Sequence, residues 1–188
     1  DNIDSNVDLT VGATLTNDGG TINLDNKDSI ANGGSISQTS GTINADNFST
    51  TESGGSLQAS GGSLNISLGS LTLNNANDNI VDGATVDMQG NLTINNGSIT
   101  LNTGDKLNNS TITQNGGSLT ISEISTGSAT LNSTSGNLTL DGATIEGNDT
   151  IAGAVNTTIG ANGVTISNTS ADGITLNNGD KINGTVNQ

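Results

Sequence analysis

A short phrase that begins with glycine recurs along the whole chain and constrains the fold more than any single residue. The phrase is Gly-x-[Ile/Leu]-x-[apolar], the alternation of a strand with one buried face. It begins at Gly20, Gly41, Gly62, Gly90, Gly117, Gly136 and, in a shortened form, Gly163. Successive copies lie 21, 21, 28, 27, 19 and 27 residues apart. One unit repeated at such spacings predicts a solenoid.

We therefore predict an all-β fold, a single parallel β-helix domain over residues 1–188, with about seven to eight coils of 19–28 residues. Right-handed coils are expected, because parallel crossovers are right-handed. The longer coils carry an added strand, at 71–73, 99–101 and 174–176, which accounts for the longer spacings. Stacked phrases predict an inward column of Ile22, Ile43, Leu64, Leu92, Leu119, Leu138 and Val164. No segment has helical periodicity, and glycine recurs too often for helices.

The composition is compatible with a thin aliphatic core. Apolar residues make up 29% of the 188 residues, with one Phe and no Trp or Tyr. So few apolar residues would by themselves suggest disorder. The regular apolar positions and the absence of Pro favour stacked strands instead, because Pro removes a ladder donor. No apolar run approaches the roughly 18 residues of a membrane span, so we expect no membrane insertion.

Charge and missing residue types exclude several classes of function. Eighteen acids face three bases, for a net charge of −15, so binding to nucleic acid or to an anionic membrane is not expected. The sequence has no His and no Cys, and its three bases are all Lys. We predict no enzyme activity, no catalytic residues and no cofactor-binding residues. Some parallel β-helices cleave glycosides with paired acids, but Phe48 is the one aromatic residue that could support a sugar.

A second motif, Asp-x-[Ile/Leu], follows several strands. Its copies begin at Asp28, Asp78, Asp105, Asp149 and Asp180. The expected role is structural: the apolar residue fills a corner of the core and the Asp accepts backbone N–H bonds of the turn. The alternative is calcium, which prefers oxygen ligands. If adjacent coils placed Asp78 near Asp105 and Asp149 near Asp180, these four residues would be candidate Ca²⁺ ligands. The sequence lacks the nonapeptide repeat of calcium-binding β-rolls.

The outward positions of the phrase form a polar column. It begins with Asn and continues with Thr, through Asn23, Asn44, Asn65, Thr93, Thr120, Thr139 and Thr165. Some solenoid ice-binding proteins present flat Thr-x-Thr arrays, which occur here only at Thr14 and Thr111. A solvated β face is the main interpretation, and ice binding is the lesser alternative.

The glycine phrases and the shorter Gly-[Ser/Thr]-[Ile/Leu] strands resemble the β-solenoid stalks of secreted bacterial adhesins. These include filamentous-haemagglutinin-type proteins and autotransporter passenger domains. The resemblance covers nearly the whole chain and is specific for architecture; the sequence shows no haemagglutinin secretion domain and no autotransporter barrel. It implies a secreted or cell-surface protein, bacterial or archaeal, that forms a stalk or filament.

The two ends of the sequence lie inside motif material, from Asp1-Asn-Ile to the segment 180–188, without a capping helix. Exposed strand edges invite another copy to stack. We expect either an excerpt of a longer rod or a subunit that self-associates head to tail into a filament. The alternative is an adhesin module that binds a surface glycan or a host receptor.

Overall fold

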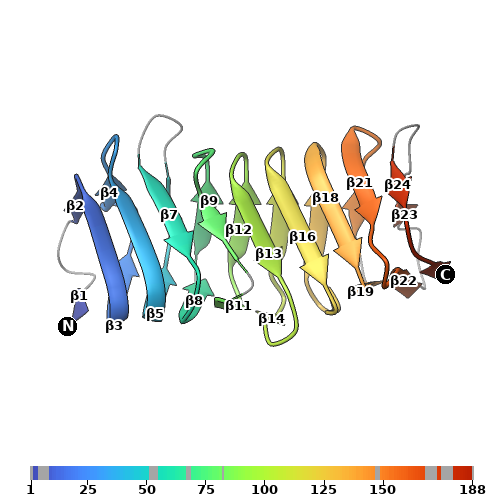
Figure 1. The fold of residues 1–188 in the computed structure, drawn as a ribbon, viewed down its shortest axis with the longest axis horizontal. Helices are drawn as coiled ribbons and strands as arrows, with labels where there is room; N and C mark the ends of the chain where they lie inside the picture. The colour runs from blue at the N-terminus through green and yellow to red at the C-terminus, as the bar shows by residue number, and fades with distance from the viewer. Residues whose placement is uncertain are drawn as a thin grey trace.

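A computed structural model describes residues 2–3, 9–50, 55–66, 69–81, 83–146, 149–167, 173–174 and 180–187. These residues form a rod of parallel strands with the two termini at opposite ends (Figure 1). The predicted fold class is confirmed: the described part of the protein is all-β, without helix, and winds into a parallel β-solenoid with about the expected number of coils.

Each coil has three sides. In one coil, β7 (Ser56–Ala59), β8 (Ser63–Ile66) and β9 (Ser70–Leu73) follow one another around the core. The next strand, β10 (Asn79–Ile80), returns to pair in parallel with β7. We call the sides that carry β7, β8 and β9 the first, second and third face. The described coils repeat this order, so the strands of each face succeed one another in parallel along the rod.

The first face begins with the N-terminal halves of the long strands β3 (Thr14–Leu24) and β5 (Ser35–Ala45). It continues through β7, β10, β13 (Ser98–Leu101), β16 (Ser118–Ser122), β18 (Gly136–Asp141), β21 (Val155–Ile159) and β24 (Lys181–Ile182). In the rod of Figure 1, these strands succeed one another from the N-terminal to the C-terminal end.

The second face contains β1 (Asn2–Ile3), the C-terminal halves of β3 and β5, β8, β11 (Thr85–Met88), β14 (Lys106–Leu107), β19 (Ala143–Glu146), β22 (Val164–Ser167) and β25 (Val186–Asn187). A bridge between Ser125 and Thr144 marks the coil between β14 and β19. The third face contains β2 (Thr10–Val11), β4 (Ser29–Ile30), β6 (Phe48–Ser49), β9, β12 (Asn91–Ile94), β15 (Thr111–Gln114), β17 (Thr130–Ser133), β20 (Thr150–Ile151) and β23 (Gly173–Ile174).

Coil length is nearly constant, which corrects the expectation that some coils are longer by a whole strand. Paired residues lie 18 apart at Asn132 and Thr150 and 23 apart at Thr158 and Lys181, the extremes among the described pairs. The strands expected at 71–73 and 99–101 are present as β9 and β13. They are ordinary members of three-sided coils and not insertions. Of the expected strand at 174–176, Ile174 alone lies within the described residues.

The inward column predicted from the phrases is correct for its first three members, and Val164 is buried on the same second face, but Leu92, Leu119 and Leu138 lie elsewhere. Ile22 pairs with Ile43 and Ile43 with Leu64, but Leu64 then pairs with Val86. Leu92 belongs to the third face, and Leu119 and Leu138 to the first. The phrase therefore moves from one face to another along the sequence, because all three faces need the same alternation of apolar and polar residues.

The core is a narrow aliphatic column with Phe48 as its one aromatic member. Two fully buried glutamines brace its corners. Gln38 donates Nε2–H bonds to the carbonyls of Gly61 and Ser63, both at 3.0 Å. Gln114 donates to the carbonyl of Asn137 at 2.9 Å and accepts the hydroxyl of Ser133 at 2.7 Å. These amides bond to backbone carbonyls at the start of neighbouring strands, so their own buried polar groups are satisfied.

Glycines are required where corners stack, at Gly97 and at the phrase glycines Gly117 and Gly136. Gly97, Gly117 and Gly136 have φ values of 75°, 61° and 99°, in the left-handed region that disfavours side chains. They also stack directly: a Cβ on Gly117 would lie 2.5 Å from the Gly97 carbonyl oxygen, and one on Gly136 would lie 2.6 Å from that of Gly117. Both conformation and space therefore exclude a side chain here.

Gly117→Ala is expected to lower the free energy of unfolding by about 3 kcal/mol, since it combines left-handed strain with overlap of the preceding coil. Gly127→Ala is the matched control. Gly127 has φ 54°, but the nearest atom to its Cβ position is Ser125 Oγ at 3.9 Å, so only the conformational cost of about 1 kcal/mol applies. Denaturant titration of both variants measures the difference, and equal losses would contradict the stacking argument.

Candidate functional site

The Asp-x-[Ile/Leu] corners use the aspartate to continue a ladder. One oxygen, Oδ1, accepts the backbone N–H of the residue that lies opposite in the preceding coil. The pairs are Asp28 with Leu9 at 2.7 Å, Asp78 with Leu57 at 2.8 Å, Asp105 with Val86 at 2.7 Å, Asp149 with Leu131 at 2.6 Å and Asp180 with Thr157 at 2.9 Å. The carboxylate thus replaces a backbone carbonyl at the point where the backbone enters a new strand.

The second oxygen closes the turn before that strand. Oδ2 accepts the N–H of the residue three positions earlier: Asp25 for Asp28, Asn75 for Asp78 and Asn102 for Asp105, at 2.7, 3.0 and 2.8 Å. The predicted role of the aspartates in turn chemistry is confirmed for these residues. The bond to the preceding coil was not predicted. A signal was present in the sequence, because each aspartate lies about one coil length after the residue whose N–H it accepts.

The structure does not stack the candidate calcium ligands as expected. Asp78 precedes β10 on the first face, whereas Asp105 precedes β14 on the second. Asp149 precedes β20 on the third face and Asp180 precedes β24 on the first. The prediction required Asp78 and Asp105, and likewise Asp149 and Asp180, to lie one coil apart. In the sequence each pair is separated by more residues than one coil contains, which is 18 to 23. Among the described residues, no group of three or more His, Cys, Asp or Glu side chains gathers to hold a metal ion.

Calcium is therefore expected to leave the melting temperature unchanged. Backbone N–H groups already point at the aspartate oxygens, and a cation would have to replace them while leaving those donors unsatisfied. Calorimetric titration with CaCl₂ should show no saturable heat, and EDTA should have no effect on melting. A saturable heat that disappears in Asp78→Asn or Asp149→Asn would restore the metal interpretation.

Asp78 is the most enclosed of these carboxylates, with 1% of its surface exposed. Besides the two backbone donors, it accepts the hydroxyl of Thr50, which is itself buried. Burial raises the pKa of Asp78 above the ordinary value of 3.8, and the hydrogen bonds from Thr50, Leu57 and Asn75 oppose this rise without cancelling it. Protonation of Asp78 is therefore easier in the folded rod than in the unfolded chain.

This pKa shift has a defined sign in stability. A folded pKa above the unfolded one gives a contribution that is fully present below the unfolded value and is lost as pH rises through the folded value. Acidification from about pH 7 to about pH 4 should therefore stabilise the wild-type protein more than Asp78→Asn, which cannot titrate there. Melting temperatures of both proteins across this range provide the measurement. Parallel curves would show that Asp78 does not titrate in this window.

Asparagine ladders run along the outside of the rod. On the second face, Asn44 donates to Asn23 at 2.7 Å and Asn65 donates to Asn44 at 2.8 Å. At a corner after the third face, Asn95 donates to Asn74 at 2.8 Å and Asn115 donates to Asn95 at 3.0 Å. In each bond Nδ2 of the later coil donates to Oδ1 of the earlier coil. The ladders therefore give the rod a direction.

The outward threonines form columns other than the predicted one. Thr100, Thr120, Thr139 and Thr158 are in register on the first face. Beside them runs a second polar column of Ser98, Ser118, Asn137 and Asn156. Thr93 instead lies with Thr72 and Thr113 on the third face, and Thr165 with Thr144 on the second. The nearly equal spacings within the first-face column were a usable signal in the sequence.

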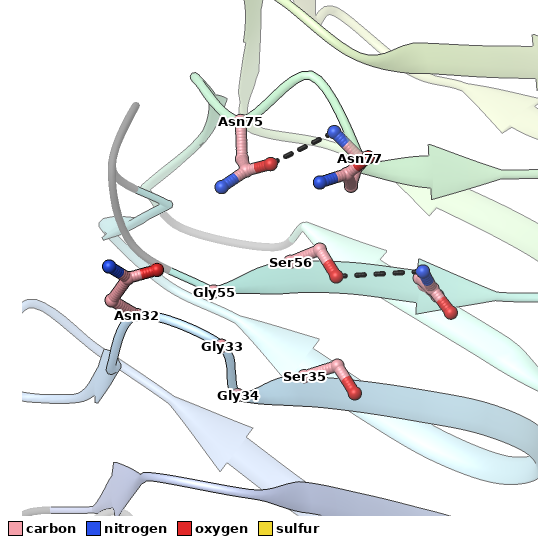
Figure 2. A pocket seen from close by; sticks show the side chains of 9 residues that line it. Asn32, Gly33, Gly34, Ser35, Gly55, Ser56, Asn75 and Asn77 are labelled. Atoms are coloured by element: carbon pink, nitrogen blue, oxygen red, sulfur yellow. Dashed lines mark hydrogen bonds between the residues drawn. The ribbon is translucent and has the colours of Figure 1, made fainter.

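A polar cavity of about 370 Å³ opens near the N-terminal end, between successive corners (Figure 2). It is lined by Asn32, Gly33, Gly34, Ser35, Gly55, Ser56, Gln58, Asn75 and Asn77. Two of its side chains already bond within the cavity wall: Asn75 Oδ1 accepts the N–H of Asn77 at 2.9 Å, and Ser56 Oγ accepts from Gln58 at 3.5 Å. The lining carries amides and hydroxyls but no acid or base, so it has no pair for proton transfer.

None of the described residues forms a helix of the length and apolarity needed to cross a membrane. Comparison of the sequence and structure with protein-family models, curated proteins and solved structures finds no significant match.

Proposed function

We propose that this protein is a structural rod, a β-solenoid that forms or extends a filament or adhesin stalk at a cell surface. The observation that carries the proposal is the continuity of the first-face ladder, which runs through β3, β5, β7, β10, β13, β16, β18, β21 and β24, with the two termini at opposite ends of the rod (Figure 1). Each coil adds about 4.8 Å of length, so the length of the rod is proportional to the number of coils in the sequence.

The chemistry of the surface supports a role in spacing. Three lysines face eighteen acids, and the resulting net charge of −15 opposes association of rods side by side. A rod of fixed length requires the coils to stay bound to one another, which the aspartate corners and asparagine ladders achieve with bonds between successive coils. Secretion to a bacterial or archaeal surface is part of the proposal and rests on the resemblance and on composition.

The last described coil supports extension by a further rung. Ile182 pairs with the buried Ile159, and Val186 pairs with the buried Val164. Ile182 and Val186 are nevertheless 54% and 39% exposed. A further rung would bury both side chains. A further coil of a longer rod would cover them, and so would a second copy stacked head to tail, since the direction of the asparagine ladders favours copies that point the same way.

Negative-stain electron microscopy and sedimentation of the purified protein test this function. Rods that join end to end into fibres as concentration rises are the expected result, and Ile182→Asp with Val186→Asp should leave single rods. Antibody labelling of intact source cells should detect the protein at the surface. Compact particles, strictly single rods at high concentration, or labelling that requires lysis would each overturn the corresponding part of the proposal.

Binding to a periodic surface is the second candidate function. The two neighbouring columns of the first face place hydroxyl and amide groups on a grid, about 4.8 Å apart along the rod and about 6.6 Å apart along each strand. Such a grid fits an ordered ligand, with ice as the case to test. Thermal hysteresis and ice shaping that vanish in Thr120→Lys with Thr139→Lys would support it, and their absence in the wild type would remove it.

The adhesin-module alternative is tested at the polar cavity. Binding of the protein to a glycan array, and loss of that binding in Gln58→Ala, would favour it.

A further inference from the structure

Several Asn-Gly pairs occur in the sequence, and the structure treats them differently. Asn-Gly is the dipeptide in which the following backbone nitrogen is least shielded, because glycine has no side chain. If this nitrogen attacks the asparagine carboxamide, ammonia leaves and the side-chain amide is converted into a carboxylate. Whether it can attack depends on what else holds the N–H and the side chain.

At Asn96–Gly97 the two reacting groups face each other. The N–H of Gly97 donates to Oδ1 of its own neighbour Asn96 at 3.0 Å. This contact holds the Asn96 carboxamide beside the Gly97 nitrogen, so the two groups that must join in the reaction are already neighbours in the folded rod. Asn96 is exposed to water, and the Gly97 N–H takes no part in the ladder bonds that hold its neighbours Asn96 and Ser98.

The pair Asn115–Gly116 lies at the same corner one coil later, one position earlier in register, opposite Asn95 and Asn96, and it is held on both sides. The N–H of Gly116 donates to the carbonyl of Ile94 at 3.2 Å. The Asn115 side chain donates to Asn95 at 3.0 Å and accepts the hydroxyl of Thr134 at 3.1 Å. At Asn162–Gly163 the N–H of Gly163 is likewise held, by the carbonyl of Gly160 at 3.1 Å.

We propose that Asn96 is a site of spontaneous deamidation directed by the fold. In the reaction the Gly97 nitrogen gives its proton to hydroxide and attacks Cγ of Asn96, ammonia leaves, and a succinimide forms. Water then opens the ring at either carbonyl and yields aspartate or isoaspartate. No oxidant, reductant or metal takes part.

The product would alter the corner in two ways. It adds a negative charge to a protein whose net charge is already −15. Isoaspartate also inserts a methylene into the backbone beside Gly97, where space is short: a Cβ at Gly97 would lie 2.7 Å from both Cβ and the carbonyl oxygen of Asp78, and Gly117 stacks on Gly97 from the other side. The modified coil should therefore be the first to loosen as the rod ages.

The test is peptide mapping by mass spectrometry after incubation of the full-length protein in mildly alkaline buffer, with isoaspartate quantified at each Asn-Gly pair. In the native protein, Asn96 should deamidate roughly tenfold faster than Asn115 or Asn162, since these must first break a backbone hydrogen bond. In concentrated guanidinium chloride the rates at Asn96 and Asn115 should converge, because the folded geometry is removed. Asn96→Gln should abolish the fast phase and leave the melting temperature unchanged.

Two results would overturn the proposal. One is a native rate at Asn115 that equals or exceeds the rate at Asn96. The other is a ratio of the two rates that is the same in guanidinium chloride as in the native protein, which would assign the difference to local sequence alone.

Discussion

Removal of residues 98–117 is expected to leave a folded rod that is shorter by one rung. Ser98 and Ser118 are register partners one coil apart, so the deletion joins Gly97 to Ser118 and keeps the sequence Gly-Ser followed by alternating apolar residues. Strand β10 can then pair with β16 in place of β13. We expect the circular dichroism of the wild type and a length reduced by about 4.8 Å in small-angle scattering.

Removal of residues 98–107 is the matched control. It deletes about half a coil, so every following strand arrives at a different face and the three ladders lose their register. The coils cannot adjust to this change of register, because apolar residues of one coil would lie beside polar residues of the next. The shorter deletion should therefore unfold all the coils that follow it, while the longer one does not. If both deletions unfold the protein, its coils are not interchangeable units and the proposed spacing function loses its basis.

Asp78→Ala is expected to cost about 4 kcal/mol of unfolding free energy, the largest effect of any single substitution considered. The change leaves three buried donors without the acceptor they share: the N–H of Leu57, the N–H of Asn75 and the hydroxyl of Thr50. It also leaves a cavity at a corner of the core. Urea titration of the wild type and the variant gives the difference.

Asp46→Ala is the control for that loss. Asp46 also follows a strand, but its side chain is exposed, and within the described part of the protein it accepts one long bond, from Asn47 at 3.3 Å. Its removal should change stability by no more than about 0.5 kcal/mol. A loss at Asp78 as small as that at Asp46 would mean that water replaces the carboxylate at the corner, and that the aspartates do not join the coils.

The solenoid class could be predicted because its signals are local. Alternation over four residues, as in Gly-Ser-Leu-Thr-Ile at 117–121, defines a strand with one buried face, and the absence of Pro removes the main obstacle to long ladders. The aspartate corners could be predicted for the same reason, since Asp28, Asp78 and Asp105 bond to the residue three positions before them.

The register could not be predicted from the phrase, because three faces with the same alternation make the copies interchangeable. Gly90-Asn-Leu-Thr-Ile aligns equally well with the phrase at Gly62 and with Ser70–Leu73, and only the backbone pairing shows that Leu92 lies against Leu71. Polar outward residues were the better guide. Asn74, Asn95 and Asn115 follow one another at nearly equal spacings and bond to each other directly, so their spacing reports the coil length.

The wrong register also made the predicted calcium site wrong. Asp78 and Asp105 are separated by more than one coil, so they lie on different faces and cannot share a cation as stacked neighbours. The first-face column of Thr100, Thr120, Thr139 and Thr158 was missed for the same reason. Its members belong to different phrases, and only the nearly constant coil length brings them together.

The position of the two termini at opposite ends of the rod has a mechanical consequence. Tension applied between them acts on the terminal coil first, and that coil can peel away while the remaining coils keep their bonds to one another. A coil of 18 to 23 residues that occupied about 4.8 Å of rod releases roughly 60–80 Å of extended backbone. Single-molecule stretching should show steps of this size. A rod of this kind yields gradually under load, one coil at a time, and shortens again when the load is removed.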